Sequence, residues 1–295
     1  MPWTWPTLPL ERRKGKMGEM PHPEFTGPPT LIASDVDGTL IDDNNVVPEL
    51  VRTMINKATS AGATFVIATG RPPRWIAEIT DQIDIEPYAV CANGAIVYDV
   101  ATDRILHSET LRAPVLEKLA EFAYQQIPGC GLAVERVGKS AHDAATPPFV
   151  ATSGYKHAWL NPDHIEMSEA DVLSQDAVKM LVRRPEMTSD EMARRMAAVV
   201  GDLADVTYST DNGLIELAAP GVSKASGLQV LARLRDLPVD ASIAFGDMPN
   251  DIEMLRWVTR GFAMADGHQA AIDAADEIAP DNNAGGVGQV LTRWF

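Results

Sequence analysis

Two short acidic motifs in this chain of 295 residues contain the side chains best suited to chemistry. The first motif holds Asp35 and Asp37, the second holds Asp247 and Asp251, and each follows an apolar run that predicts a strand. Because the carboxyl ends of strands meet at one edge of an open α/β sheet, we expect the four carboxylates to share a pocket. Two carboxylates ~4 Å apart repel each other by about 4 kcal/mol at an effective dielectric constant of about 20, so the cluster needs a cation. All-oxygen ligands of this kind suit Mg²⁺.

Asp35 has the position of a nucleophile. A carboxylate at a strand end, beside a metal ion, can attack phosphorus and form an aspartyl phosphate. Asp37 lies two residues further on, and continued strand geometry would place both side chains on one face. Its carboxyl group could protonate the leaving oxygen and then accept a proton from the hydrolytic water. The residues therefore predict phosphoryl transfer from an ester.

Groups that could hold a phosphoryl group follow other predicted strands. Thr69 and Gly70 offer a hydroxyl and a backbone N–H at a turn into a helix, whose N-terminus favours an anion. Lys224 falls in the first turn of a predicted helix, where its charge opposes the dipole unless it faces a phosphate or the nucleophile. Asn250 adds a neutral hydrogen-bonding group. Taken alone, Thr69 and Gly70 fit a simple turn equally well, and Lys224 fits a solvated helix residue.

The elements that must position these residues alternate between strand and helix. Strands are expected over 31–35, 64–68, 88–91, 242–245 and 261–265, and helices over 48–60, 223–234, 250–258 and 269–275. Nearly continuous apolar strands between helices indicate an α/β fold with a parallel sheet covered on both faces. A polar turn between 95–98 and 104–107 predicts a hairpin after the third strand.

A middle region interrupts the alternation and predicts an inserted α/β domain. It contains helix-like segments over 114–126 and 189–203, with Ser189 as N-cap, and strand-like segments over 131–137, 179–183 and 206–209. The stretch 138–166, rich in Pro, His and small residues, predicts a loop. We place the core over 30–112 and 213–295 and the inserted domain over 113–212. Residues 1–29, Pro-rich and without periodicity, predict a disordered or extended tail.

The composition excludes several classes of function. A formal net charge of -16 argues against binding a nucleic-acid backbone or an anionic membrane, but leaves a small anionic substrate open. Cys91 and Cys130 lack metal-site or disulfide spacing, which fits a reducing compartment such as the cytoplasm. No apolar run approaches the ~20 residues of a membrane span. The first residues also lack the apolar stretch of a secretory signal.

These motifs together resemble the haloacid dehalogenase superfamily, in its Cof-type branch. The four main segments are 35–40 (DVDGTL), 67–71 (IATGR), 221–224 (GVSK) and 246–251 (GDMPND). Supporting matches are 92–95 (ANGA) and 261–265 (GFAMA), and the resemblance covers about residues 30–295. By chance, the two acidic motifs would occur together in this order in about one chain in 10⁵.

The resemblance implies a Rossmann-like doubly wound core with a type IIB cap inserted after the second motif, and Mg²⁺-dependent hydrolysis of phosphate monoesters. Asp35 would be the nucleophile and Asp37 the acid and base. The metal ligands would be the Asp35 carboxylate, the Asp37 backbone carbonyl and Asp247, with Asp251 in support. The transferring phosphoryl group would be held by Thr69, Gly70, Lys224 and Asn250.

The predicted cap offers few sharp signals about the substrate. Lys179, Arg183 and Arg184 could reach a second anionic group, although solvated or strand-edge charges explain them about twice as well. His142, His157 and His164 lack metal-ligand spacing, and Tyr155 and Trp159 could stack on a sugar or base or simply pack. Where the family often has Asn-Ala, this chain has Asp266 and His268, which add a charge and a titratable group near the expected rim.

We therefore predict a Mg²⁺-dependent phosphatase that hydrolyses small phosphorylated metabolites, with sugar phosphates among the candidates and no nucleic-acid or membrane partner. Val36 between the paired aspartates favours hydrolysis over an ion-pumping ATPase, which has lysine there. Asp37 disfavours a dehalogenase, whose leaving group needs no acid. Two alternatives stay open: a phosphosugar mutase with the same core, and a non-catalytic metabolite sensor.

Overall fold

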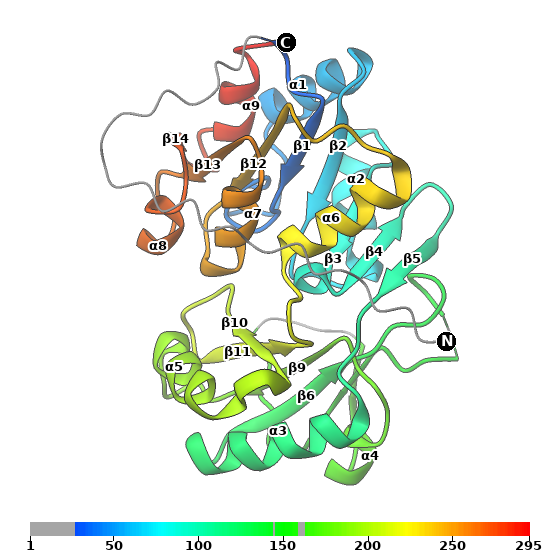
Figure 1. Ribbon diagram of the computed structural model, residues 1–295, viewed down its shortest axis with the longest axis vertical. Coiled ribbons are helices and arrows are strands. Elements are labelled where there is room, and N and C mark those ends of the chain that lie inside the picture. Colours follow the sequence, from blue (N-terminus) through cyan, green and yellow to red (C-terminus); the bar gives the residue numbers. More distant parts are fainter. Residues whose placement is uncertain (1–26, 144, 159–162) are drawn as a thin grey trace.

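The computed structural model describes residues 27–143, 145–158 and 163–295. All but the end of the predicted tail, and Trp159, lie outside the described residues. The described chain forms two sheet-and-helix parts, one above the other in Figure 1, and the chain passes from the first part to the second and back. This is the α/β core with an inserted α/β domain that the sequence predicts.

The first sheet has the strand order β14-β13-β12-β1-β2-β3-β4-β5. Its strands are β1 (Leu31–Ser34), β2 (Thr64–Ala68), β3 (Tyr88–Cys91), β4 (Ile96–Asp99), β5 (Arg104–Ser108), β12 (Ser242–Gly246), β13 (Arg260–Met264) and β14 (Glu277–Ala279). The pairings from β14 to β3 are parallel, and β4 and β5 add an antiparallel hairpin at one edge. β1 and β12, which precede the two acidic motifs, are neighbours.

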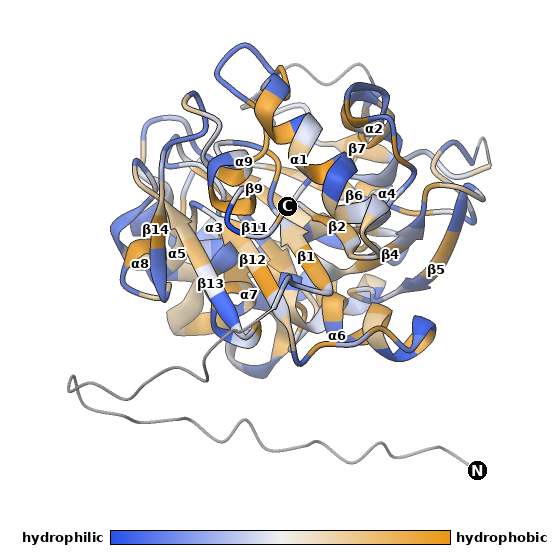
Figure 2. Ribbon diagram, turned by 90° about the horizontal axis from the view of Figure 1, so that it is seen from above, coloured by the Kyte–Doolittle hydropathy of each residue, from blue (hydrophilic) through white to orange (hydrophobic). Residues whose placement is uncertain are grey.

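Helices cover both faces of this sheet (Figures 1 and 2). One face carries α1 (Glu49–Ser60), α2 (Ala77–Ile83) and α9 (Gly286–Leu291), and the other carries α6 (Lys224–Arg235), α7 (Ile252–Trp257) and α8 (Gln269–Ile272). Successive strand residues point to opposite faces: Ile32 packs in one buried cluster with Val51 of α1, whereas Leu31 packs with Leu228 of α6. Both faces are therefore apolar, which explains the continuous apolar runs.

The second sheet has the strand order β10-β11-β9-β6-β7-β8. Its strands are β6 (Gly131–Glu135), β7 (Phe149–Ala151), β8 (His164–Glu166), β9 (Lys179–Arg183), β10 (Asp205–Thr207) and β11 (Leu214–Ala218). Three helices, α3 (Ala113–Gln126), α4 (Glu169–Leu173) and α5 (Ser189–Val200), pack against one face. Figure 1 shows α3 and α5 on the side away from the first sheet, so the other face of the second sheet looks toward the core.

Three expectations about the inserted domain need correction. The stretch 138–166 is not all loop, because it contains β7 and β8, which at three residues each are too short for a period to be visible. The N-cap of α5 is Thr188, whose hydroxyl accepts from the Glu191 N–H, whereas the Ser189 hydroxyl accepts from Leu214. The boundary at 213 falls too early, since β11 pairs with β9 and β10 in the second sheet. An apolar run predicts a strand without showing which sheet it joins.

Candidate active site

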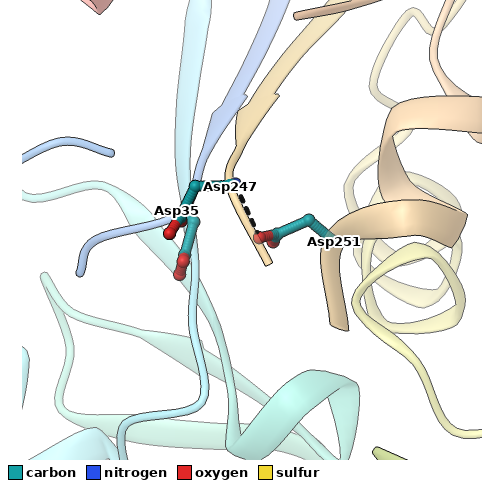
Figure 3. A group of neighbouring side chains, drawn as sticks. All are labelled: Asp35, Asp247 and Asp251. Carbon is teal, nitrogen blue, oxygen red and sulfur yellow. Dashed lines mark hydrogen bonds between the residues drawn. The ribbon is translucent and has the colours of Figure 1, made fainter. Parts of the chain in front are cut away.

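The sheet register brings the two acidic motifs together. β1 pairs in parallel with β12, and the Asp35 N–H donates to the Phe245 carbonyl at 3.0 Å. Carboxylate oxygens of Asp35, Asp247 and Asp251 lie within 4.8 Å of one another (Figure 3). Residues more than two hundred positions apart in the chain thus form one cluster at the carboxyl edge of the sheet, where α/β proteins bind ligands.

Asp251 binds both the backbone of the second acidic motif and Lys224. Its Oδ2 accepts the backbone N–H groups of Asp247 and Met248, both at 3.0 Å. Its Oδ1 receives the Lys224 ammonium at 2.6 Å, and the same ammonium lies 2.7 Å from Asp35 Oδ1. Lys224 is fully buried. The two carboxylates stabilise its ammonium, although a positive charge at the N-terminus of α6 is unfavourable for the helix dipole.

The cluster holds more negative charge than its cation can balance. Lys224 serves Asp35 and Asp251, while Asp247 has no cationic partner among the described residues and accepts only the Thr39 hydroxyl, at 2.9 Å. Burial, reinforced by neighbouring carboxylates, raises the pKa of Asp35 to about 7 and that of Asp247 to about 9. Burial alone would lower the pKa of Lys224, but Asp251 and Asp35 more than offset it and raise that pKa. A crowded set of oxygen donors with this charge fits a hard divalent cation.

Asp37 stands apart from the other three carboxylates. The chain turns at Val36, whose carbonyl accepts the Leu40 N–H at 2.9 Å, so the expected strand geometry ends before Asp37. The Asp37 side chain is 59% exposed and binds Arg71 through two hydrogen bonds of 2.9 and 2.6 Å. The turn also needs Gly38, at φ +74°, because a β-carbon there would lie 2.5 Å from the Asp247 carboxylate. The structure therefore places Asp37 at the edge of the cluster.

The predicted phosphate-binding residues lie beside the cluster on neighbouring strand ends. Thr69 is fully buried, and its hydroxyl accepts the Arg71 N–H at 3.1 Å at the start of the turn. Asn250 donates its amide Nδ2 to the Asn93 Oδ1 at 3.1 Å. A β-carbon at Gly70 would lie 3.0 Å from that same Asn93 oxygen, so the turn and Asn93 are in close contact. Sequence reasoning noted Asn93 within a motif but gave it no role.

Lys179 reaches the predicted phosphate-binding turn, but its charge is already paired with a carboxylate of the second sheet. Its ammonium donates to Glu216 Oε1 at 2.6 Å and to the Gly70 carbonyl at 2.8 Å. Lys179 and Glu216 are 4% and 2% exposed. Sequence reasoning missed Glu216, although a lone carboxylate inside the apolar strand β11 was the available signal. Sequence reasoning also missed Arg74, which follows the 67–71 motif. Its guanidinium lies 2.5 Å from the Glu135 carboxylate of β6.

The other candidate residues of the predicted cap bind within the protein. Arg183 donates to the carbonyls of Lys156 and Asn212, and Arg184 to that of Gly129. His157 Nε2 and His164 Nδ1 form a hydrogen bond of 2.6 Å. Tyr155 packs edge-on against Phe149, and His142 lines a small cavity near Arg136. Near the rim, Asp266 is exposed, and the His268 N–H donates to the Asp247 carbonyl at 2.7 Å. Within the described part of the chain, no helix has the length and apolar character to span a membrane.

Comparison with known proteins identifies the family. The model of the haloacid dehalogenase-like hydrolases matches residues 32–291. The chain belongs to this family. It is 26% identical over 277 residues to the 5-amino-6-(5-phospho-D-ribitylamino)uracil phosphatase YitU of Bacillus subtilis, covering 90% of this chain and 98% of the relative. It is 29% identical over 271 residues to the 5-amino-6-(5-phospho-D-ribitylamino)uracil phosphatase YbjI of Escherichia coli, covering 89% of this chain and 95% of that protein.

The solved structures agree on the fold. The subclass IIB sugar phosphatase BT4131 superposes with a TM-score of 0.73 at 18% sequence identity, covering 90% of this chain and 98% of that one. The resemblance of the motifs to the haloacid dehalogenase superfamily, with a Cof-type core and a type IIB cap, is confirmed. The protein is a phosphatase, a phosphoric monoester hydrolase, as the sequence predicts.

Proposed function

We propose that this phosphatase is Mg²⁺-dependent and hydrolyses small phosphorylated metabolites through an aspartyl phosphate on Asp35. The observation that carries the proposal is the uneven charge of the catalytic cluster: of three buried or half-buried carboxylates, two share one ammonium and the third, Asp247, has no cationic partner among the described residues. A divalent cation would complete this balance and let Asp35 remain ionised at neutral pH. Lys224, 2.7 Å from Asp35, favours the same ionised form.

The residues that would hold the ion are the side chains of Asp35 and Asp247 and the backbone carbonyl of Asp37, with Asp251 in support. When bound, Mg²⁺ would neutralise charge on the transferring phosphoryl group and on the carboxylates. The Thr39 hydroxyl keeps Asp247 oriented toward the cluster. The two backbone N–H groups on Asp251 keep the second acidic loop in place.

The reaction assigned to these residues has two steps. A carboxylate oxygen of Asp35 forms a bond to phosphorus while the ester P–O bond breaks, and Asp37 gives its proton to the leaving oxygen. Water then attacks the phosphorus of the aspartyl phosphate, Asp37 takes the water proton, and the bond to Asp35 breaks to release phosphate. Asp37 is exposed and reachable at the edge of the cluster, where Arg71 holds it.

The phosphoryl group would be held by the predicted set Thr69, Gly70, Lys224 and Asn250. These residues follow two strands, β2 and β12, and begin one helix, α6, so the group would be surrounded at the sheet edge. Positioning and electrostatic stabilisation would then supply most of the catalysis, since phosphoryl transfer needs little other covalent assistance from the protein.

The substrate class follows from the relatives. Two of them are phosphatases of 5-amino-6-(5-phospho-D-ribitylamino)uracil, a phosphorylated sugar alcohol attached to a pyrimidine. We therefore place this compound first among candidate substrates, with sugar phosphates next. A cytoplasmic location, inferred from the two unpaired cysteines, accompanies this proposal.

The test is a phosphate-release assay with purified protein, Mg²⁺ and a panel holding the ribitylaminouracil phosphate, a pentose phosphate, a hexose phosphate and a nucleotide. We expect free phosphate from at least one ester, and none after chelation of the metal. Product analysis distinguishes the alternatives, because a phosphosugar mutase would yield an isomerised phosphosugar without free phosphate. Binding without turnover of any ester would favour the sensor and contradict the proposal.

A further inference from the structure

Each of the three carbonyl groups in the turn 69–71 accepts a hydrogen bond from outside the turn. Two of the donors are the backbone N–H groups of the segment 92–93, each at 3.0 Å. The third donor is the Lys179 ammonium, which lies 2.8 Å from the Gly70 carbonyl oxygen. The segment 92–93 follows β3 of the first sheet, whereas Lys179 begins β9 of the second. The second sheet therefore holds the middle carbonyl of a turn that belongs to the catalytic edge of the first.

These contacts fix the direction in which the Gly70 N–H points. The Thr69 carbonyl accepts from the Asn93 N–H, and Asn93 follows β3, on one side of β2. The peptide between Thr69 and Gly70 is trans, so its N–H points the opposite way, toward β1 and the Asp35 that follows it. Gly70 is partly exposed, and its N–H donates to no acceptor among the described residues. This N–H is therefore available to a phosphoryl oxygen.

The next peptide, between Gly70 and Arg71, is the one that Lys179 holds. Its carbonyl accepts from the ammonium, and its N–H donates to the Thr69 hydroxyl at 3.1 Å. A glycine rotates about its backbone bonds at little cost, so without both contacts this peptide could reverse. Arg71 binds Asp37, the acid and base of the proposed reaction. A reversal would therefore displace the Gly70 N–H on one side of the peptide and Arg71 on the other.

Lys179 is itself held in place by the second sheet. Its side chain is 4% exposed, and its ammonium lies 2.6 Å from Glu216 Oε1. An ammonium has three donors and no acceptor, so one hydrogen can bind the carboxylate while another binds the Gly70 carbonyl. A hydrogen bond from a charged donor is about twice as strong as one between neutral groups. The charge of Lys179 is thus paired without taking its donor away from the turn.

We propose that Lys179 is a positioning residue that holds the peptide between Gly70 and Arg71. In this position the Gly70 N–H meets the transferring phosphoryl group, and Arg71 meets Asp37. The inference rests on the proposed function and deepens it, because it makes the phosphoryl site of the core depend on a residue of the second sheet. Lys179 does not touch the substrate in this assignment. Its removal weakens phosphate binding and the acid–base step without removing any group that the proposed reaction uses.

The first test combines Lys179→Met with Glu216→Gln, which removes the donor to the turn without leaving a buried charge unpaired. With p-nitrophenyl phosphate and Mg²⁺ we expect kcat to fall about tenfold and the inhibition constant of inorganic phosphate to rise about tenfold, the effect of losing about one well-placed hydrogen bond. Arg74→Met combined with Glu135→Gln is the matched control. It removes another buried ion pair between the two parts, one that makes no hydrogen bond to the turn, and should keep both constants within about threefold of wild type.

The second test needs no turnover. The Arg71 N–H is bonded to the Thr69 hydroxyl, so its hydrogen exchange with solvent, followed by NMR, should be slow in the wild type. We expect this exchange to be at least about tenfold faster in the first double variant and unchanged in the control. Exchange at Val66, in the middle of β2, reports any general loss of stability and should not change. Unchanged exchange at Arg71, or equal losses of activity in the two double variants, would overturn the proposal.

A third measurement uses the wild type alone and does not depend on how the variants fold. Because the Gly70 N–H has no acceptor among the described residues, inorganic phosphate added with Mg²⁺ should move its proton resonance downfield as a hydrogen bond forms. A resonance that does not move in a wild type that hydrolyses esters would overturn the inference. A wild type that releases no phosphate from any ester would instead remove the proposed function, and exchange at Arg71 would then decide whether Lys179 holds the turn.

Discussion

The catalytic edge of the first sheet and the facing side of the second sheet both bury charged groups, but they balance them differently. On the second sheet, the buried carboxylates of Glu216 and Glu135 each have a cation, Lys179 and Arg74, at 2.5–2.6 Å, and Arg74 also pairs with the partly exposed Asp163. At the catalytic edge, Lys224 is shared by two aspartates, and Asp247 has no cation among the described residues.

This difference separates a docking surface from a ligand site. A buried carboxylate with its own cation is largely neutralised, and the pair needs nothing further from solution. In a cluster with surplus carboxylates, burial and mutual repulsion raise the pKa values of Asp35 and Asp247. A bound cation would stabilise the ionised form of these groups. The facing side of the second sheet therefore holds the two parts together, whereas the catalytic edge of the first sheet is available to bind a cation and a substrate.

The largest expected effect comes from the catalytic edge. Asp35→Asn should lower turnover on the order of 10⁴-fold or more, because it removes the nucleophile. The fold should persist, since Lys224 keeps Asp251 as a partner. Phosphate release and the melting temperature check this, with Asp81→Asn on the exposed side of α2 as control. Activity close to wild type would remove Asp35 from its role.

Asp37, outside the buried cluster, should matter for chemistry and little for stability. Asp37→Asn should lower kcat by about 10²–10⁴-fold, the usual contribution of a general acid–base. The free energy of unfolding should change by less than about 1 kcal/mol, because the Asp37 carboxylate is 59% exposed and Arg71 keeps Glu78 nearby. Glu78→Gln, which removes the more distant carboxylate near Arg71, is the matched control and should retain activity. A similar loss in both variants would point to Arg71 instead.

Breaking a pair on the docking surface should cost stability. Arg74→Met leaves Glu135 buried without its cation and should reduce the free energy of unfolding by about 3–5 kcal/mol at neutral pH. Burial raises the pKa of Glu135 and Arg74 opposes this, so without Arg74 the carboxyl is more easily protonated. The loss should shrink as the pH falls toward about 5. Denaturant titrations test this, and adding Glu135→Gln should recover at least half of the loss if balance is what matters.

Metal binding should produce the smallest but most specific effect. The raised pKa values of Asp35 and Asp247 mean that the metal-free fold binds more protons than the unfolded chain, so its stability falls as pH rises from about 4 toward 9. Mg²⁺ at 100 times its Kd should stabilise the fold by about 2.7 kcal/mol, with tighter binding at pH 8 than at pH 5. Thermal melts with Mg²⁺ or EDTA measure this.

Asp247→Asn distinguishes a true metal effect from a general salt effect. It should abolish most of the Mg²⁺ stabilisation while raising the melting temperature of the metal-free protein at pH 8, because folding no longer requires that carboxyl group to bind a proton. An equal Mg²⁺ response in the variant and the wild type would show that the ion binds elsewhere and would end the contrast between the two regions.

Local pattern was enough for much of the core. The strands predicted before Asp35 and Asp247 end within one residue of the ends of β1 and β12, and helix α1 lies within one residue of its predicted start. β7, β8, α4, β14 and α9 were missed because each is six residues or fewer and buries too little of a repeating face to be seen. The partners of Lys179 could not be predicted either, since Glu216 and Gly70 reach it from other parts of the chain.

The amino-acid sequence by itself determined the family, the α/β alternation and the acidic residues at two strand ends, because each depends on residue types at short spacing. Only the tertiary structure decided that Asp35 and Asp251 share Lys224 while Asp37 turns to Arg71, and that β11 joins the second sheet. The reason is physical: the balance of charge depends on which groups from distant parts of the chain come into contact in the fold. Those meetings are set by packing over hundreds of residues.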